Sequence, residues 1–427
     1  MKLRLVTGSI CYGRGVAGVL PRWIAEQFES SVDATPVVVL EGGRAVGKST
    51  LCDEVIDRRG WGERVDLADP NTLALLRIDP VRFLEALPCP AVIDEAQLEV
   101  QLPIWIKQIV DRRRVPGQFV LTGSARLGRD QLGGSDPLAG RSVRLRMWSF
   151  TAGELRARPA DFLDRAFGDG WDLGPVSNRP APMNWFGGLP GVSGVLRPGA
   201  SAQWERETAT YVESVLPLGA AGTRSDLGRL MLTFRYFAAN SGQLLNIARA
   251  ASELGVQANT VRNHVDMLEA CFLLFRVEAE RPSEHKVVIA HPRLFATDVG
   301  LASWAARAWN GPSTAVLLGS LTETLVAHDL AAAASAHRDR VVVRHWRDAR
   351  NAHEVDLLLV HPDGRLVAVE VKASTTVGPG DARGLARFAA SEPERVVRGI
   401  VVYEGARVVT LSAAGEPELV AVPRSLL

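Results

Sequence analysis

The chain has 427 residues, of which 47% are hydrophobic and 23% charged, and its formal net charge at pH 7 is +1. This composition excludes an intrinsically disordered chain, and the near-zero charge excludes a uniformly basic surface, so nucleic-acid binding would need a local patch. The length exceeds what one hydrophobic core usually holds, and it predicts two to four domains.

The cysteines and the apolar runs limit the class of protein further. The four cysteines are widely spaced and form no C-x-x-C pair, which excludes a disulfide framework and a cysteine zinc site: Cys11, Cys52, Cys89 and Cys271. No stretch reaches the roughly 18 uninterrupted apolar residues of a membrane span, and the first residues lack the apolar core of a signal peptide. We therefore expect a cytoplasmic protein that does not engage a membrane.

Short apolar runs alternate with amphipathic stretches from about residue 37 to 150, as in βαβ units. Residues 37–40 have the pattern of a buried strand that is followed by a glycine-rich loop and a helix from about Lys48. Residues 92–95 and 119–124 are two further short strands, each ending in polar side chains, with a helical stretch over 104–112 between them. The pattern predicts a parallel α/β domain.

The second half begins with a different composition. Residues 168–201 are rich in glycine, proline and tryptophan, which is typical of an irregular connector. Helical periodicity then runs from about 230 to 277, and a helix over 247–254 is followed by Gly255 and a second periodic stretch, which predicts a helix-turn-helix. A helix over 317–332 precedes four apolar strands, at 341–343, 354–360, 366–371 and 400–403.

Residues 42–49 match the phosphate-binding pattern G-x-x-x-x-G-K-[ST], between a predicted strand and a predicted helix. Glycines let backbone N–H groups approach the phosphates, and the helix N-terminus favours their negative charge. Lys48 would reach the β- and γ-phosphates, and the Ser49 hydroxyl would bind Mg²⁺. The strand–loop–helix context argues against a fortuitous turn. The predicted cofactor-binding residues are Gly42, Gly43, Arg44, Ala45, Val46, Gly47, Lys48, Ser49 and Thr50.

Acidic residues at the end of the second strand complete the predicted nucleotide site. Asp94 would hold Mg²⁺ through water, and Glu95 would polarise the attacking water. Ser124, or Thr122, ends the next strand and would sense the γ-phosphate. ATP is favoured over GTP because none of the five lysines lies in an N/T-K-x-D motif, which reads guanine.

An arginine finger is expected beyond this strand. The candidates are Arg126, Arg129 and Arg141, although each one taken singly is also explained as a solvated surface residue. Arg141 is the preferred candidate because it directly follows Leu138-Ala139-Gly140 and precedes a strand-like run.

The second half contains a carboxylate–lysine hairpin. Glu370 and Lys372 are two residues apart on an extended segment and therefore share a face. A three-residue loop at 362–364 would place Asp356 directly opposite Glu370. Facing carboxylates repel by about 3 kcal/mol at ~5 Å and an effective dielectric of about 20. This arrangement predicts a divalent-cation site in which Lys372 is catalytic and steadies a nucleophilic water.

Two alternatives stay open at this hairpin. The strand ends could be solvated, with Lys372 simply neutralising Glu370, because such surface pairs cost little. Glu323, on the preceding helix, would be a third acidic metal ligand, or else a glutamate favoured near a helix start by the helix dipole.

The chain resembles the prokaryotic AAA-type P-loop ATPases whose C-terminal half is a domain of unknown function, over about residues 20–155 and 230–385. The segments that carry the resemblance are residues 40–48, 92–97, 121–124, 138–141, 296–301, 354–356 and 370–372. Two departures stand out. Gly43 replaces the usual proline, and residues 211–219 lack an Arg-Asp-Leu that many members carry.

The resemblance implies an α/β fold in three parts. These are a P-loop NTPase (AAA-type) parallel sheet with helices on both faces, a helical winged-helix region, and a restriction-endonuclease-like α/β domain of the PD-(D/E)xK type. It places Asp356, Glu370 and Lys372 at the metal site, with Glu323 on the first helix. We predict an ATPase domain at 15–157, a connector and helical lid at 158–228, a winged-helix-like region at 229–300 and the restriction-endonuclease-like domain at 301–427.

These expectations leave two functions open. In the first, ATP binding and Mg²⁺-dependent hydrolysis control a C-terminal DNA-binding and nuclease-like module. In the second, the protein is an ATP-switched DNA-binding regulator with an inactive nuclease-like domain, in which residues 259–264 read a groove. The helix-turn-helix could also be only a packing unit, since Asp266 and Glu269 leave it weakly basic. Whether the chain forms a homo-oligomer stays open as well.

Overall fold

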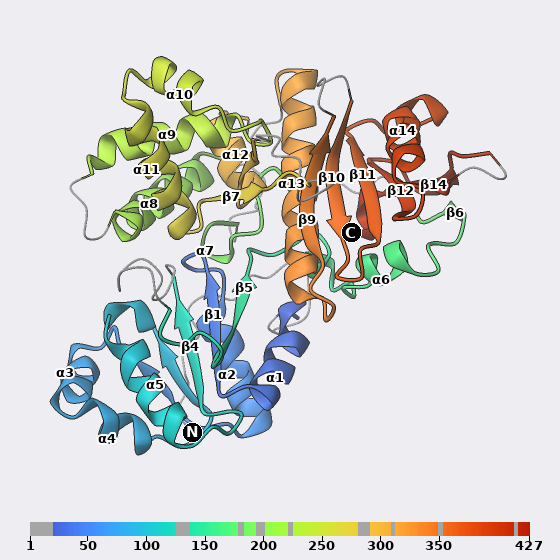
Figure 1. Ribbon diagram of the computed structural model, residues 1–427. Coiled ribbons are helices and arrows are strands. Elements are labelled where there is room, and N and C mark those ends of the chain that lie inside the picture. Colours follow the sequence, from blue (N-terminus) through green and yellow to red (C-terminus); the bar gives the residue numbers. More distant parts are fainter. Residues whose placement is uncertain are drawn as a thin grey trace. The chain divides into compact units, whose positions relative to one another are not determined.

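The computed structural model describes residues 20–124, 136–177, 183–193, 201–220, 225–280, 291–308, 312–348, 353–413 and 417–427. These residues form two compact units (Figure 1). The first comprises residues 21–149 with 270–272, and the second comprises 150–269 and 273–427. The three regions that we predicted after residue 157 thus lie together in the second unit, and each unit is described by itself below.

The first unit is built on a five-stranded sheet with the order β2-β3-β4-β1-β5. Every neighbouring pair is parallel, so the carboxyl ends of all five strands meet at one edge, where ligands bind in open α/β sheets. The strands are β1 (Val37–Gly42), β2 (Arg64–Asp66), β3 (Ala91–Asp94), β4 (Phe119–Gly123) and β5 (Ser142–Met147). The predicted parallel α/β domain is confirmed.

Helices cover both faces of this sheet. Val37 and Val39 of β1 belong to a core that also takes in apolar side chains of α3, α4 and α5. Val38 and Leu40 alternate to the other face and are fully buried, and α1 and α2 contact β1. The helices are α1 (Ile24–Ala34), α2 (Lys48–Arg59), α3 (Pro70–Ile78), α4 (Pro80–Glu85), η1 (Ala96–Leu98) and α5 (Leu102–Arg112).

The second unit begins with a mostly helical region. Its elements are η2 (Glu154–Arg156), α6 (Phe162–Phe167), α7 (Pro190–Ser193), α8 (Ser201–Gly219), α9 (Leu227–Ala239), α10 (Ile247–Leu254), α11 (Ala258–Ala270), β7 (Leu274–Val277), β8 (Arg293–Ala296) and α12 (Val299–Ala305). The predicted helix pair is present as α10 and α11, joined at Gly255, whose φ of 64° suits glycine. An antiparallel β7–β8 pair follows α11.

The hypothesis that residues 259–264 read a groove needs a correction. His264 is buried, its Nδ1 lies 2.8 Å from the Thr233 hydroxyl, and burial lowers its pKa. Val261 is buried on the same face, because positions three and four apart on a helix lie together. Only the outward residues of this stretch, such as Asn259 and Arg262, are exposed, and the two are hydrogen-bonded to each other at 2.6 Å.

The second unit continues as a seven-stranded sheet with the order β6-β13-β14-β12-β11-β10-β9. β9, β10 and β11 are antiparallel neighbours, whereas β11 and β12 are parallel and connected through α14. The elements are β6 (Gly174–Pro175), α13 (Ala315–Ala336), β9 (Val342–Arg347), β10 (Glu354–Val360), β11 (Leu366–Lys372), η3 (Pro379–Ala382), α14 (Arg383–Ser391), β12 (Val396–Tyr403), β13 (Arg407–Thr410), β14 (Leu419–Pro423) and η4 (Arg424–Leu426).

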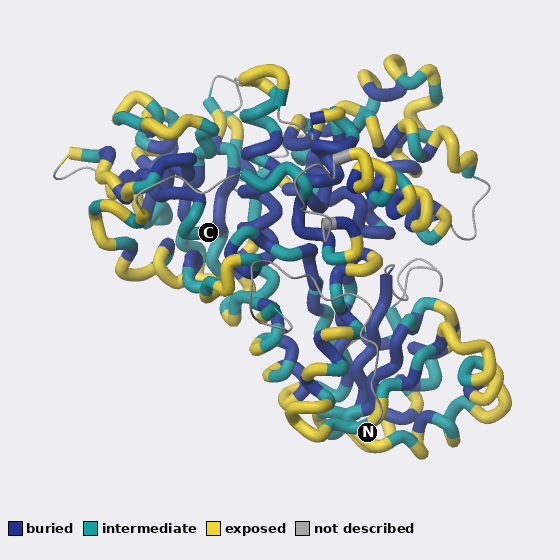
Figure 2. Tube along the Cα trace, turned by 180° about the vertical axis from the view of Figure 1, so that it is seen from behind, coloured by how far each residue is buried: buried dark blue, intermediate teal, exposed yellow. Residues whose placement is uncertain are grey.

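The central strands of both sheets are largely buried, as the dark blue segments in Figure 2 show. In the second sheet, α14 packs on a core that contains Leu358 and Ala368. The intervening Leu357 and Val369 point to the opposite face and are also fully buried. Among the described helices, α13 alone is long and apolar enough to cross a membrane, but 61% of that window is buried within the structure. It also contacts β9 and β11, so it is a core helix here.

The β10–β11 hairpin has the predicted loop and register. The partners run from Leu357 opposite Val369 to Val360 opposite Leu366, and continuing this register by one residue sets Asp356 level with Glu370. Gly364, at the third loop position, has a φ of 93°, a left-handed conformation that glycine adopts without strain.

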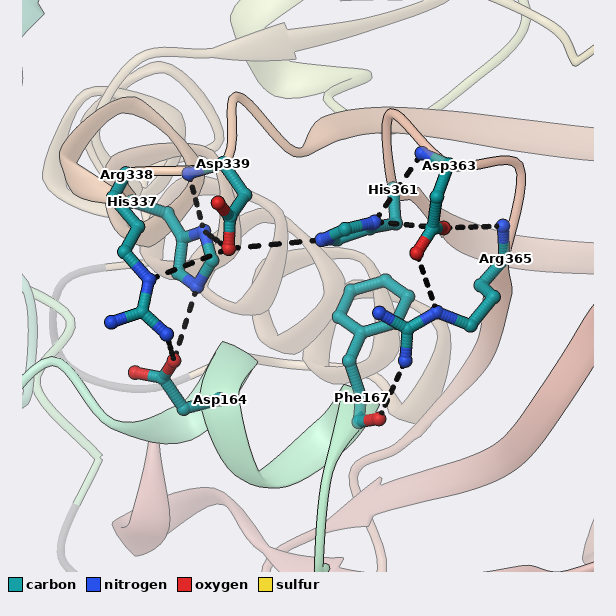
Figure 3. Close-up of polar contacts among 8 residues, drawn as sticks. All are labelled: Asp164, Phe167, His337, Arg338, Asp339, His361, Asp363 and Arg365. Atoms are coloured by element: carbon teal, nitrogen blue, oxygen red, sulfur yellow. Dashed lines mark hydrogen bonds and ion pairs between the residues drawn. The ribbon is translucent and has the colours of Figure 1, made fainter.

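A polar network holds α6 against this hairpin (Figure 3). His337 Nε2 lies 3.5 Å from Asp164 Oδ1 on α6. Arg365 Nη1 donates to the Phe167 carbonyl oxygen at 3.0 Å, and the Phe167 ring centroid is 5.1 Å from that of His361. Residues that follow α13 and residues of the hairpin loop therefore fix the same short helix.

Asp363 supports this network from the hairpin loop. Its carboxylate accepts hydrogen bonds from the Arg365 backbone N–H at 3.0 Å and from Arg365 Nε at 2.8 Å, and it lies 2.8 Å from His361 Nδ1. The Arg365 backbone bond, followed by the Arg365 and His361 side chains, lowers the pKa of Asp363 to about 2.

We expect Asp363→Asn to lower stability near neutral pH and to have less effect as the solution becomes acidic. A depressed folded-state pKa contributes stability above the unfolded value of about 3.9, and this is lost as pH falls toward 2. Urea unfolding between pH 7 and pH 3 checks this, with the exposed Asp169→Asn as the matched control. A constant difference between the Asp363→Asn protein and the parent across this range would contradict it.

Candidate functional site

The predicted phosphate-binding loop connects the end of β1 to the start of α2. Gly47 has a φ of 102°, which L side chains rarely adopt. A Cβ atom on Gly42 would lie 2.3 Å from the Met147 carbonyl oxygen, because β1 and β5 run side by side there. These two glycines of the motif are therefore required by the backbone itself.

Lys48 is buried at the centre of this loop. Its Nζ donates to the carbonyl oxygens of Gly42 and Gly43, both at 2.8 Å, and to the Ser124 hydroxyl at 3.3 Å. Burial lowers the pKa of Lys48 to about 8, while the charges of Glu95 and Asp94 oppose that shift. Lys48, the first residue of α2, and Ser124, which directly follows β4 and is predicted to sense the γ-phosphate, thus meet although they lie 76 residues apart.

Asp94, at the end of β3, is surrounded by donors. Its carboxylate accepts hydrogen bonds from the hydroxyls of Thr122 and Ser49, and Arg64 Nη1 lies 2.7 Å from its Oδ2. Burial opposes ionisation, but these three donors hold the pKa of Asp94 below its usual value. The Ser49 and Asp94 oxygens are hard ligands of the kind Mg²⁺ prefers, so this pair fits the metal that accompanies ATP.

Glu95 follows in an unusual conformation. Its φ of 53° lies in the left-handed region, which is rare for a residue with a long side chain and is often found at functional positions. Ser124 donates to its Oε1 at 3.3 Å, and the Gln97 amide donates to its Oε2. A carboxylate is therefore held beside the lysine and the serine.

Two arginines at this site, Arg22 and Arg64, belong to no recognisable sequence motif. Arg22 is buried, and its guanidinium donates to the Val46 carbonyl at 2.8 Å and to the Trp148 carbonyl at 2.5 Å, which ties the loop to the segment after β5. Arg64 bridges Asp94 and Asp53, with Nε 2.8 Å from Asp53 Oδ1. Because these contacts join residues far apart in the sequence, no local pattern could have indicated them.

Arg141 is engaged on the surface of its own unit. Its guanidinium forms a two-bond ion pair with Asp111 on α5, with Nε–Oδ1 at 2.6 Å and Nη2–Oδ2 at 3.0 Å. Arg126 and Arg129 lie outside the described residues. The assignment of an arginine finger therefore stays a prediction.

The predicted carboxylate–lysine site lies on the β10–β11 hairpin and on α13. Lys372 Nζ lies 2.8 Å from Glu370 Oε1, and Asp356 Oδ2 accepts the Val371 backbone N–H at 2.9 Å. Glu323 lies beyond the first turn of α13, so the helix dipole does not explain it. In the part of the chain that the structure describes, no group of three histidine, cysteine or acidic residues is arranged to hold a metal ion.

Arg293 is a neighbour of two of the three predicted metal ligands Glu323, Asp356 and Glu370 that the sequence did not indicate. Its Nη1 lies 2.5 Å from Glu323 Oε1 and 3.5 Å from Asp356 Oδ1, so a guanidinium stands beside two of the predicted ligands. Burial, with the charge of Asp356, raises the pKa of Glu323 to about 8 and that of Glu370 to about 7. The metal assignment, and the role of Lys372 that depends on it, stay predictions.

Three family models match successive parts of the chain. Residues 34–156 match the AAA domain, residues 183–311 a domain of unknown function (DUF8612), and residues 318–423 another domain of unknown function (DUF4143). The first match and the parallel sheet agree, so the N-terminal unit is similar to an AAA domain in both sequence and fold.

Relatives and solved structures that match more than half of the chain were also found. Uncharacterized proteins of Mycobacterium bovis and Mycobacterium tuberculosis are each 26% identical over 360 residues, which are 82% of this chain and 74% of the relative. The Walker-type ATPase of Pyrococcus abyssi is 17% identical, covering 67% of this chain and 96% of its own, with a TM-score of 0.41. A RuvB variant of Thermotoga maritima is 17% identical, covering 60% and 88%, with a TM-score of 0.27. These two structural likenesses are too loose to support an argument.

Proposed function

We propose that this protein binds ATP with Mg²⁺ and hydrolyses it at the N-terminal unit. The observation that carries the proposal is the convergence of Lys48, Ser124 and Glu95 around one point, with Asp94 and Ser49 hydrogen-bonded beside them. Phosphoryl transfer to water requires groups that bind the phosphates, the metal and the attacking water. The glycine backbone and the buried ammonium can bind the phosphates, and the two adjacent carboxylates can serve the metal and the water.

Each residue has a role that follows from its contacts. Phosphate oxygens would replace the two loop carbonyls as acceptors for the Lys48 ammonium, and their charge would favour its ionised form. Ser49 and Asp94 would hold Mg²⁺, which neutralises charge on the phosphates. Glu95 would orient and deprotonate the attacking water, while Ser124 would contact the γ-phosphate. Arg64 would keep the Asp94 carboxylate in place as a positioning residue.

Lys48→Ala should weaken ATP binding by about 100-fold, because the charge-assisted hydrogen bonds that it removes are worth about 1.5–3 kcal/mol each. Titration with a fluorescent ATP analogue in the presence of Mg²⁺ measures this. Lys107→Ala, a partly exposed lysine on α5, is the matched control and should bind as the parent does. Hydrolysis retained at the parent's rate in Lys48→Ala would refute the proposed site.

Glu95→Gln should leave ATP binding nearly unchanged and slow hydrolysis by about 10²- to 10⁴-fold, the usual contribution of a general base. Single-turnover hydrolysis and equilibrium binding, measured on the same protein, separate the two effects. Parent-like turnover would assign the base to another residue, and lost binding would show that Glu95 supports the loop instead.

A second candidate function concerns the C-terminal half. We propose an ATP-controlled module that binds DNA and has the nuclease-like fold without nuclease activity. The succession α13, β9, β10, β11, α14, β12, with Asp356 on β10 and Glu370 and Lys372 on β11, supports a restriction-endonuclease-like core. The succession α9, α10, α11, β7, β8 supports a winged-helix arrangement. The guanidinium of Arg293 between two of the acidic residues favours the inactive alternative.

The protein should therefore shift the mobility of duplex DNA without cutting it. Supercoiled plasmid incubated with the protein and Mg²⁺ should stay intact without nucleotide, with ATP and with a non-hydrolysable analogue. Cleavage that disappears in Asp356→Ala would overturn the inactive assignment. Absence of any mobility shift, in all three nucleotide states, would remove DNA as the partner.

A further inference from the structure

Glu323, Arg293 and Asp356 lie together at the border between the helical region and the seven-stranded sheet of the second unit. They line a polar groove with a volume of about 840 Å³, to which the end of α9 and the start of α13 also contribute. The three side chains are only 14%, 11% and 14% exposed, respectively. These three side chains therefore form a compact, largely buried group of charges in the groove wall.

One guanidinium connects three separate elements here. Arg293, the first residue of β8, donates through Nε to the Gly242 carbonyl at 2.7 Å, between α9 and α10. Its Nη1 lies 2.5 Å from Glu323 on α13 and donates to the Asp356 backbone carbonyl on β10 at 3.1 Å. The side chain thus bonds both to the backbone of the helical region and to the sheet with its long helix.

A strand irregularity makes this contact available. The β9–β10 register shifts between Val355 and Leu358, which brackets Asp356. A bulge of this kind leaves a residue outside the ladder and redirects its groups. The Asp356 carbonyl then accepts from Arg293, while its carboxylate accepts the Val371 N–H at 2.9 Å. The backbone carbonyl and the carboxylate of Asp356 therefore both accept hydrogen bonds from the chain itself.

The charges favour an internal cation over a metal ion. A buried carboxylate without a partner costs several kcal/mol, and Mg²⁺ requires near-ideal octahedral oxygen ligands at about 2.0–2.1 Å. The Arg293 guanidinium occupies the space beside Glu323 and Asp356, and Lys372 pairs with Glu370 at 2.8 Å. Arginine stays protonated at all physiological pH values, so this cation is permanent.

The border around Arg293 is also joined through backbone hydrogen bonds. His345 on β9 donates its N–H to the Glu278 carbonyl at 3.0 Å and accepts the Glu280 N–H at 2.7 Å, directly after β7. Its Nε2 lies 3.1 Å from the carbonyl oxygen of His291, two residues before Arg293. The segments on both sides of the β7–β8 pair are therefore bonded to the edge of the sheet.

We propose that Arg293 is a fixed internal cation that takes the place of a divalent metal in this carboxylate cluster and joins the helical region to the second sheet. The cluster then works as a structural joint. The inference concerns the second unit alone and does not depend on ATP hydrolysis, so failure of one proposal leaves the other standing.

The test measures thermal unfolding and Mn²⁺ binding on the full chain, treated with a chelator and free of nucleotide. Every protein compared, the parent included, also carries Lys48→Ala, so that nucleotide binding at the first unit does not affect the measured Tm or Mn²⁺ binding. Electron paramagnetic resonance should detect no Mn²⁺ bound to the parent. This part of the test does not depend on whether a variant folds. Arg293→Met should lower Tm by about 6–10 °C, the range expected for a broken buried ion pair in a unit of this size. It should also gain Mn²⁺ binding and recover part of the lost Tm with the metal.

Arg347→Met is the matched control, because Arg347 lines the same groove but pairs with Glu354 at 3.7 Å in a more exposed position. Its Tm should fall by less than about 2 °C, as expected for a surface pair. Mn²⁺ binding by the parent that disappears in Asp356→Asn would overturn the proposal. So would an Arg293→Met protein that is as stable as the control, or one that is destabilised but gains no affinity for Mn²⁺.

Discussion

The Asp94 carboxylate is the point on which the nucleotide site depends. The parallel sheet brings the ends of β3 and β4 to one edge, and β2 adds Arg64 from the side. Donors from these strands and from α2 keep Asp94 ionised although it is buried. Without that charge, Lys48 would lose one of the two acidic neighbours that oppose the lowering of its pKa.

Lys48 in the first unit and Arg293 in the second are buried cations with different kinds of partner. In the first, Lys48 is held by backbone carbonyls and a hydroxyl, all neutral acceptors that an anionic ligand can replace at little cost. In the second, Arg293 and Lys372 contact the acidic side chains directly. Removing one partner of such a pair leaves an uncompensated charge. The first arrangement suits a site that binds and releases a ligand, and the second suits a permanent connection.

Much of the fold and of the nucleotide site followed from local pattern. Apolar runs that end in polar residues located β1, β3 and β4, and the glycine–lysine motif located the loop because its spacing reflects backbone geometry. The loop at 362–364 fixed the register of β10 and β11 because a tight turn leaves one pairing possible. The helical periodicity of α11 also indicates its buried side, and the structure places His264 on that side, away from solvent.

The sequence by itself therefore determined which segments fold as strands and helices, where the phosphate-binding motif lies, and which carboxylates face each other. These features depend on residues close together in the chain. Only the tertiary structure decided which cations accompany those carboxylates. Arg64 is 30 residues from Asp94, and Arg293 is 63 residues from Asp356. A pairing of this kind is set by how whole elements pack, so no local spacing records it. The hairpin predicts a metal beside Asp356, and the packing of β8 places a guanidinium next to the same carboxylate.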